Sequence, residues 1–389
     1  MIIYLQELNI KFKNIFPLIL FLIPFIPHAE IYGPYIHTDD IPVFLFLTIA
    51  IFYILKEKMY VLGLTGKFLF IFLFYIILQN FYLNNTFLSS DIYRFTFYIV
   101  LYIYTTNMKE KNQEYNIPLI SFLLLSIFSV LSFLFEINLG NDGYQTWNIG
   151  FNPSELDYLK GRVNGFQAGG PNSFADLVTV LSIYCIYKYK NVYSLFIAPL
   201  ALIAVAVTYS RFSLIVLVLF LISKLVKEKL YSYLFLFLCL LFIIGISLGI
   251  YDRFINDDNN GISDRVLMLE SSIDYYLESS VVSKMIGNGS NELIFQSSNV
   301  YLIDDFKENP YSYGPHNSFI FYLINYGLFG LILYLLVFYE LLKKGRKSDF
   351  NLITILAFLV LSLTTDLLHN HSVSWFFYFV YFSYLKIEN

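Results

Sequence analysis

Apolar runs separated by short polar stretches repeat along almost the whole chain. Many are close to the length of about 20 residues that crosses a bilayer as a helix. The apolar run over residues 195–222 is too long for one span, so we divide it at the polar sequence TYSRFS. The pattern predicts about twelve membrane-spanning helices, at residues 14–30, 41–55, 68–83, 92–106, 117–138, 172–187, 192–209, 211–223, 230–250, 316–341, 350–368 and 373–385.

Composition supports the bilayer as the solvent of this chain. Of its 389 residues, 57% are hydrophobic and 14% are charged, whereas a soluble domain carries about 25% charged residues. No basic patch indicates a nucleic acid partner. Both cysteines, Cys185 and Cys239, lie in apolar segments, so no disulfide framework follows. The sequence predicts an all-α polytopic membrane protein that forms a single integral membrane domain over residues 1–389.

Charge sets the orientation of the predicted helices. If the N-terminus is cytoplasmic, 17 of the 25 Lys and Arg residues fall on the cytoplasmic side, as the positive-inside rule expects. Both termini are then cytoplasmic. The first apolar run has a poor cleavage site, with Pro27 at the −3 position, and we interpret it as a helix rather than a signal peptide.

The outer side receives the two long connections, residues 139–171 and 251–315. The second is predicted to be a large, partly helical extracytoplasmic loop. Its sequence SDRVLMLESSIDYYLESS predicts an amphipathic helix with one apolar stripe formed by Val266, Leu269, Ile273 and Tyr276. Five of the six arginines and all five histidines also fall outside, so we expect any chemistry to face outward.

Arg211, in VTYSRFSLIVL, is the first candidate for that chemistry. An arginine at membrane depth is costly and is usually paired or functional. Its guanidinium matches phosphate oxygens with two parallel hydrogen bonds. The alternative is an interfacial anchor whose side chain reaches the lipid headgroups.

Two further arginines lie in the outer loops. Arg265 begins the predicted loop helix, where a local contact with Asp264 is the alternative. Arg162, in GRVNGFQAGGPNSFA, is surrounded by glycines that let a backbone approach a ligand closely. Its alternative is a simple flexible loop.

His316 opens the apolar stretch PHNSFIFYLINYGLFG. A helix N-terminus favours neutral imidazole, which can accept a proton as a general base. At about 100° per residue, His316, Gly327 and Gly330 fall within about 60° of one another on this helix. The two glycines would then let another helix pack closely against the helix that carries His316. The alternative is a polar residue that caps this helix.

Metal chemistry has two weaker candidates. Asp39 and Asp40 could hold a divalent cation, although helix capping explains them equally well. His369 and His371 flank Asn370 in a short loop, which is a weak ligand spacing.

The stretch from His316-Asn317 through nine residues to Gly327, and two more to Gly330, resembles the H-[NSQ]-x9-G-x-x-G signature of the O-antigen ligase/polymerase superfamily. Three other segments resemble that family in the same order: GRVNGFQAGGPNSFA, TYSRFSLIVLV and SDRVLMLESS...MIGNGSNE. The resemblance covers about residues 160–345.

This resemblance implies a GT-C-type glycosyltransferase of the ligase/polymerase branch in the bacterial cytoplasmic membrane, without metal or other cofactor. Arg211 and Arg265, and less securely Arg162, would bind the diphosphate of an undecaprenyl-diphosphate-linked oligosaccharide. His316 would be the catalytic base, and Asn317, Gly327 and Gly330 would be structural. We expect an O-antigen or capsular polysaccharide polymerase, with membrane lipid and a chain-length regulator protein as candidate partners.

Three other functions remain open. A ligase or oligosaccharyltransferase would use the same donor and the same residues. A metal-dependent enzyme would use Asp39 and Asp40. A lipid-linked glycan flippase is more distant, because transporters place charge near the membrane midplane whereas these arginines gather at one face.

Overall fold

The computed structural model describes residues 19, 21–27, 30–32, 36–38, 40–57, 62–84, 90–107, 116–140, 148–153, 161–166, 170–189, 191–247, 260–289, 316–346, 349–365 and 374–378. The chain divides into two compact units. Unit 1 comprises Met1–Met59, Met108–Phe254 and Ser372–Val380, and unit 2 comprises Tyr60–Asn107, Ile255–His371 and Tyr381–Asn389. Each unit is described by itself, and the single domain over residues 1–389 stays a prediction.

Helices occupy the predicted spans from residues 41–55 to residues 350–368. These helices face other helices or lipid, and both surroundings are apolar. The length of each apolar run therefore predicts the helices better than a repeat of apolar residues on one helix face does. They are α2 (Asp40–Glu57), α3 (Leu64–Asn84), α4 (Ser90–Asn107), α5 (Ile117–Phe135), α6 (Gly170–Lys188), α7 (Asn191–Ala206), α8 (Arg211–Lys227), α9 (Tyr231–Ser247), α15 (Ser318–Gly345) and α16 (Asp349–Leu361).

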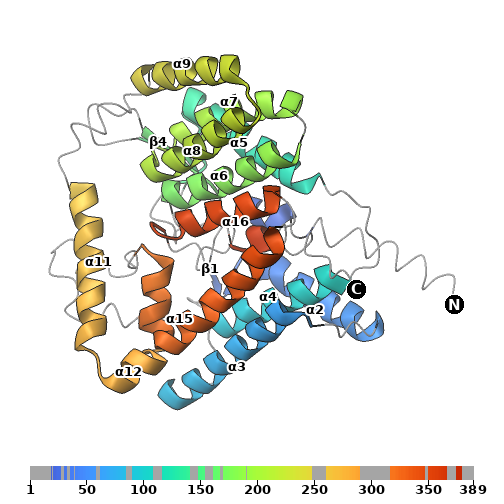
Figure 1. Cartoon of the computed structure of the whole chain (residues 1–389), viewed down its shortest axis with the longest axis vertical. Helices are drawn as coiled ribbons and strands as arrows, with labels where there is room; N and C mark the ends of the chain where they lie inside the picture. The colour runs from blue at the N-terminus through green and yellow to red at the C-terminus, as the bar shows by residue number, and fades with distance from the viewer. Residues whose placement is uncertain are drawn as a thin grey trace. The chain divides into compact units, whose positions relative to one another are not determined.

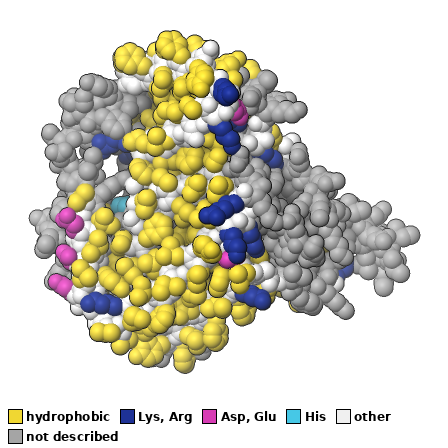
Figure 2. Space-filling model, in the orientation of Figure 1, with side chains coloured by type: hydrophobic (Ala, Val, Ile, Leu, Met, Phe, Trp, Pro, Cys, Tyr) yellow, Lys and Arg dark blue, Asp and Glu magenta, His cyan; other side chains and the backbone are white. Residues whose placement is uncertain are grey.

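Among the described residues, three helices are long and apolar enough to cross a membrane: α3 over Leu64–Leu83, α5 and α15. Shorter apolar helices lie at Phe196–Ala206, Tyr231–Ile246 and Asn351–Leu361. Hydrophobic side chains dominate the face seen in Figure 2. The chain is a mostly helical membrane protein, while twelve spans and a GT-C-type architecture stay predictions.

In unit 1, α6 lies at the centre of a helical bundle. Its residues 174–186 are all buried, and it packs against α5, α7 and α8. The buried stretch includes one charged side chain, Asp176, which is 1% exposed. A buried carboxylate is costly without hydrogen-bond partners, so its surroundings bear directly on the candidate site.

Two small antiparallel sheets depart from the predicted all-α fold. Strands β1 (Glu30–Tyr32) and β2 (Ile36–His37) form one. Strands β3 (Gly150–Pro153) and β4 (Gly161–Asn164) form the other, with Gly150 opposite Asn164. These strands are too short to leave an alternating pattern in the sequence. The second sheet packs on α5 and α6, which decides its conformation.

In unit 2, α15 packs against α3, α16 and two loop helices, α11 (Asn260–Glu278) and α12 (Val281–Ile286). Figure 1 shows α15 as two segments that meet at an angle beside α12. Aromatic rings fill the core of this unit. Tyr322 and Tyr334, on opposite sides of the bend, stack with ring centroids 4.6 Å apart. The described part of the 251–315 loop is helical, as predicted.

Candidate functional site

The predicted site residues are divided between the two units. Arg162 and Arg211 belong to unit 1. The others belong to unit 2: Arg265, His316, Asn317, Gly327 and Gly330. The candidate residues of unit 1 are described first, and those of unit 2 follow.

Arg211 is the first residue of α8. The predicted division of the long apolar run is confirmed: α7 ends at Ala206, and Tyr209 takes a left-handed φ of 55° in the turn between the helices. A cation in the first turn opposes the helix dipole. An anion bound here would interact favourably with both the guanidinium and the backbone N–H groups of that turn.

A chain of hydrogen bonds beneath Arg211 fixes the start of α8. The Ser213 hydroxyl donates to Asp176 Oδ1 at 2.6 Å, and the Ser210 and Ser213 hydroxyl oxygens are 2.7 Å apart. Because Ser213 uses its proton on Asp176, Ser210 donates to Ser213. Asp176 was missed as a contributor, although it is the one charged residue in the predicted span 172–187, a signal that marks functional positions.

Arg162, in β4, joins three segments of unit 1. Its Nε donates to the Thr208 carbonyl and its Nη2 donates to Asn172 Oδ1, each at 2.9 Å. The backbone N–H of Val163 donates to the Val207 carbonyl at 3.1 Å. The sheet is thereby tied to the turn before Arg211 and to the beginning of α6. These contacts give Arg162 a structural role that its sequence context did not predict, while its role toward diphosphate stays a prediction.

The Arg162→Ala variant should lower the thermal stability of the purified protein. Each lost bond is made by a charged donor, and such bonds contribute about 1.5–3 kcal/mol. Melting temperatures of Arg162→Ala, Asn172→Ala and the double variant would test this. We expect the two losses to be non-additive because they share a bond. If Arg162→Ala lowers turnover and leaves the melting temperature unchanged, the residue serves substrate rather than structure.

His316 lies just before α15 rather than on it. Its φ is 45°, a left-handed value that is uncommon outside glycine. Asn317 is the N-cap: its Oδ1 accepts from the N–H groups of Phe319 and Ile320 at 3.0 and 3.1 Å. The predicted helix N-terminus is therefore confirmed, but the helix begins at Ser318, two residues after His316.

The turn after α16 holds this cap in place. Asn317 Nδ2 donates to the Leu363 carbonyl at 3.1 Å. The Ser318 N–H donates to the Ser362 carbonyl and its hydroxyl donates to the Thr365 carbonyl, each at 2.9 Å. The backbone on which His316 is mounted is thus bonded to a second helix end.

The shared helical face predicted for His316, Gly327 and Gly330 is wrong. Gly327 has φ 63° and ψ −171°, so α15 is broken there. A 100° advance per residue cannot be carried across the break. A Cβ on Gly327 would lie under 3.0 Å from backbone atoms of Met285 and Gly287. Gly327 thus admits the close approach of the end of α12 and of the turn that follows it.

The turn at residues 287–289, GNG, fills the break. The N–H of Asn288 donates to the Ile324 carbonyl at 3.0 Å, and that of Gly289 to the Asn325 carbonyl at 2.9 Å. Carbonyls released by a helix break need such donors because lipid supplies none. Gly330 has a different function: a Cβ there would collide with the Tyr326 side chain, which the break brings over it.

Two side chains of α3 complete the junction. Tyr75 Oη donates to the carbonyls of Ile286 and Tyr326, each at 2.8 Å. Gln79 Nε2 donates to the Asn325 carbonyl at 2.6 Å and also to that of Ile286. The loop helices are therefore anchored to α15 at its break.

Arg265 belongs to α11, and its side chain lies outside the described residues. The predicted stripe of α11 is partly wrong: Val266 and Ile273 are 46% and 37% exposed, whereas Met268 and Ser272 are 5% and 1% exposed. The apolar run of residues 266–269 is compatible with several orientations, and packing against α15 selects one. The helix that carries Arg265 is followed by α12 and the 287–289 turn, which contact α15, the helix that begins just after His316. The same group of packed elements therefore supports both residues.

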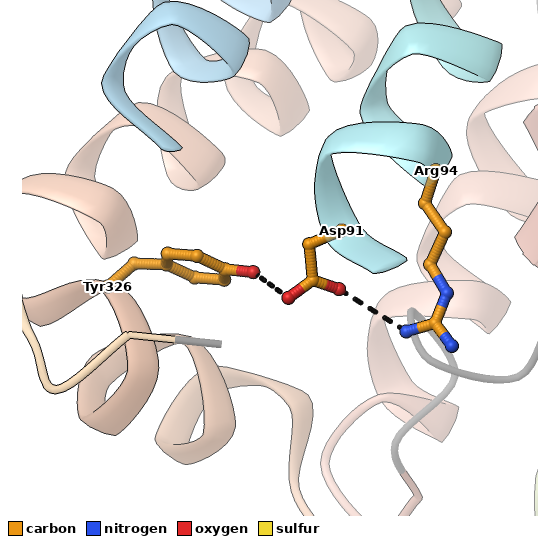
Figure 3. Close-up of polar contacts among 3 residues, drawn as sticks. All are labelled: Asp91, Arg94 and Tyr326. Carbon is orange, nitrogen blue, oxygen red and sulfur yellow. Dashed lines mark hydrogen bonds and ion pairs between the residues drawn. The ribbon is translucent and has the colours of Figure 1, made fainter. Parts of the chain in front are cut away.

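Sequence reasoning also missed a buried polar cluster in unit 2 (Figure 3). The Tyr326 hydroxyl donates to Asp91 Oδ2, and Arg94 Nη1 lies 3.3 Å from Asp91 Oδ1. Asp91 and Arg94 are 3% and 9% exposed. Their i,i+3 spacing at the start of an apolar segment was the available signal.

The metal alternatives stay untested, because most of their residues lie outside the described part of the chain. Asp40 is the first residue of α2 and is 5% exposed. Asp39, His369 and His371 lie outside the described residues. Within the described part of the chain, no group of three or more His, Cys, Asp or Glu residues could hold a metal ion.

A family model described as O-antigen ligase matches residues 196–335, about a third of the chain. The match contains Arg211, Arg265, His316 and both glycines of the signature, and it leaves out Arg162. No curated protein matches the chain. The match over residues 196–335 confirms the resemblance to the O-antigen ligase/polymerase superfamily that the sequence showed.

Proposed function

We propose that this protein is a polysaccharide polymerase that transfers a growing glycan from undecaprenyl diphosphate to a lipid-linked repeat unit. It would act at the outer face of the bacterial cytoplasmic membrane, with both termini cytoplasmic. The observation that carries this proposal is the O-antigen ligase match, because Arg211, Arg265 and His316 all lie inside it.

The proposed chemistry gives His316 one task and the two arginines, Arg211 and Arg265, another. His316 accepts the proton of the acceptor hydroxyl. The hydroxyl oxygen forms the new bond to the anomeric carbon, and the bond from that carbon to the phosphate oxygen breaks. Its electron pair goes to the departing diphosphate, whose charge Arg211 and Arg265 stabilise. Attack opposite the leaving group inverts the anomeric centre, and no metal takes part.

Arg211 has the electrostatic setting that this task requires. It begins α8, where backbone N–H groups also favour an anion, and the Ser210–Ser213–Asp176 chain fixes the turn that carries it. A positioned cation stabilises developing charge without reorganising during the reaction. This arrangement supports the role of Arg211 as a diphosphate ligand.

Replacement of Arg211 tests this role. We expect Arg211→Ala to slow glycan extension about 100- to 1000-fold and to leave mainly single-repeat glycans. Arg211→Lys should retain part of the rate, because the charge remains while the bidentate geometry is lost. Glycan length and initial rate are the measurements. Arg346→Ala, at an exposed arginine after α15, is the matched control. Wild-type chain lengths from Arg211→Ala would contradict the proposal.

An O-antigen ligase with the same donor is the alternative, since the family model that matches residues 196–335 is described as O-antigen ligase. Ligase and polymerase differ in the acceptor alone. In a strain that lacks this gene, loss of a polymerase leaves single lipid-linked repeat units, whereas loss of a ligase leaves long lipid-linked polymer. The accumulated species therefore decides between them. A chain-length regulator protein remains a predicted partner of the polymerase.

A further inference from the structure

The break at Gly327 makes the outer part of α15, residues 318–326, a short helix with its own supports. Glycine breaks interrupt the hydrogen-bond ladder that would otherwise make the two halves of a helix one rigid rod. The orientation of residues 318–326 then depends on the contacts of the segment itself, which are the stacking of Tyr322 in its middle and the polar contacts at its two ends. One end carries His316 and the Asn317 cap, and Tyr326 forms the other.

At the Tyr326 end, the strongest side-chain contact is the one with Asp91 on α4. Tyr326 is 1% exposed, and its hydroxyl donates to one oxygen of the carboxylate (Figure 3). Arg94 faces the other oxygen at 3.3 Å. A buried carboxylate persists only when it is paired and hydrogen-bonded. Asp91 thus has a charged partner on one oxygen and a hydroxyl donor on the other, and hydrogen bonds to a paired carboxylate are among the stronger ones.

We infer that Asp91 is a positioning residue: through Tyr326 it orients residues 318–326 and so sets the position of His316. This inference rests on the proposed role of His316 as the base. Residues 318–326 span about 13 Å, so a small rotation at Tyr326 displaces the other end. A misplacement of about 1 Å at a reacting group can slow a reaction about 100-fold.

A core cluster that served only stability would behave differently. Its loss would lower the melting temperature and the amount of folded protein, and each folded molecule would keep its turnover. A positioning role predicts a lower kcat in folded protein with an unchanged KM, because Asp91 and Tyr326 act through His316 and not on the substrate.

The first experiment measures kcat and KM of purified full-length protein with a synthetic lipid-linked repeat unit. We expect Tyr326→Phe, which removes only the hydroxyl, to lower kcat about tenfold and to leave KM unchanged. Asp91→Asn should add little to Tyr326→Phe, since both disrupt one bond. Tyr339→Phe on the exposed side of α15 and Asp274→Asn on the surface of α11 are the matched controls. An unchanged kcat in folded Tyr326→Phe would overturn the inference.

The second experiment does not depend on activity. In a background where Cys185 and Cys239, the free cysteines of the described residues, are replaced by alanine, His316→Cys is labelled with a membrane-impermeant maleimide. Adding Tyr326→Phe should change the labelling rate severalfold, and adding Tyr339→Phe should not. Equal rates would overturn the positioning role.

The two experiments separate this inference from the proposed function. If labelling responds to Tyr326→Phe while His316→Asn remains active, the positional link stands and His316 is not the base. If His316→Asn is inactive while Tyr326→Phe changes neither kcat nor the labelling rate, His316 remains the proposed base and Asp91 does not position it.

Discussion

The Gly327→Ala variant is expected to lose the folded junction between α15 and the loop helices. Its φ of 63° and ψ of −171° belong to a region that is essentially restricted to glycine. An added Cβ would also meet backbone atoms of Met285 and Gly287, which cannot move aside as a side chain can. We expect a loss of about 4 kcal/mol or more in the free energy of unfolding.

The melting temperature in detergent and the amount of protein in the membrane would measure this effect. Gly287→Ala should behave alike, because its Cβ would meet the Asn325 carbonyl from the other side of the junction. Gly245→Ala in α9 is the matched control: apart from its own helix backbone and chain neighbours, no atom of the described residues lies within 4 Å of its Cβ, and alanine is a better helix former. A Gly327→Ala protein as stable as Gly245→Ala would show that the break is not required.

His316→Asn is expected to abolish most glycan transfer while the protein remains folded. Asparagine tolerates the left-handed conformation that His316 adopts, so the cap and its bonds to the turn after α16 can persist. What is lost is a side chain that can accept a proton. General base catalysis contributes about 100- to 10,000-fold, and we expect a loss of kcat in that range.

A companion variant makes this test sharper. His316→Gly relieves any backbone strain and leaves space near the missing ring, so added imidazole should restore part of its activity. Initial rates of both variants, with and without imidazole, are the measurement. If His316→Asn keeps wild-type turnover, the residue acts as a polar cap and another group must accept the proton.

The apolar runs predicted where the helices lie because each run is local and long. The polar interruption TYSRFS likewise predicted that a helix begins at Arg211, and the ordered motifs predicted the family. A helix start near His316 was predicted for the same reason, whereas the N-cap role of Asn317 was found only in the structure. The predicted features required no knowledge of distant contacts.

The arrangement of the candidate site residues was harder to predict than the helices, because it depends on contacts between residues far apart in the sequence. The His316–Gly327–Gly330 face failed because the calculation assumed a continuous helix, whereas a turn forty residues earlier in the chain fills the break. The partners of Arg162, Thr208 and Asn172, lie on a different helix and turn. The orientation of α11 was ambiguous in a run of four apolar residues until packing against α15 buried Met268.

The sequence by itself predicted a helical membrane protein that resembles the O-antigen ligase/polymerase superfamily, with one helix starting at Arg211 and another near His316. Hydrophobic length and local capping decide such features, and both can be read from neighbouring residues. Only the tertiary structure decided that α15 breaks at Gly327 and that Asp91 holds Tyr326. Buried carbonyls and carboxylates must find partners wherever the fold brings them, and those partners lie far away along the chain.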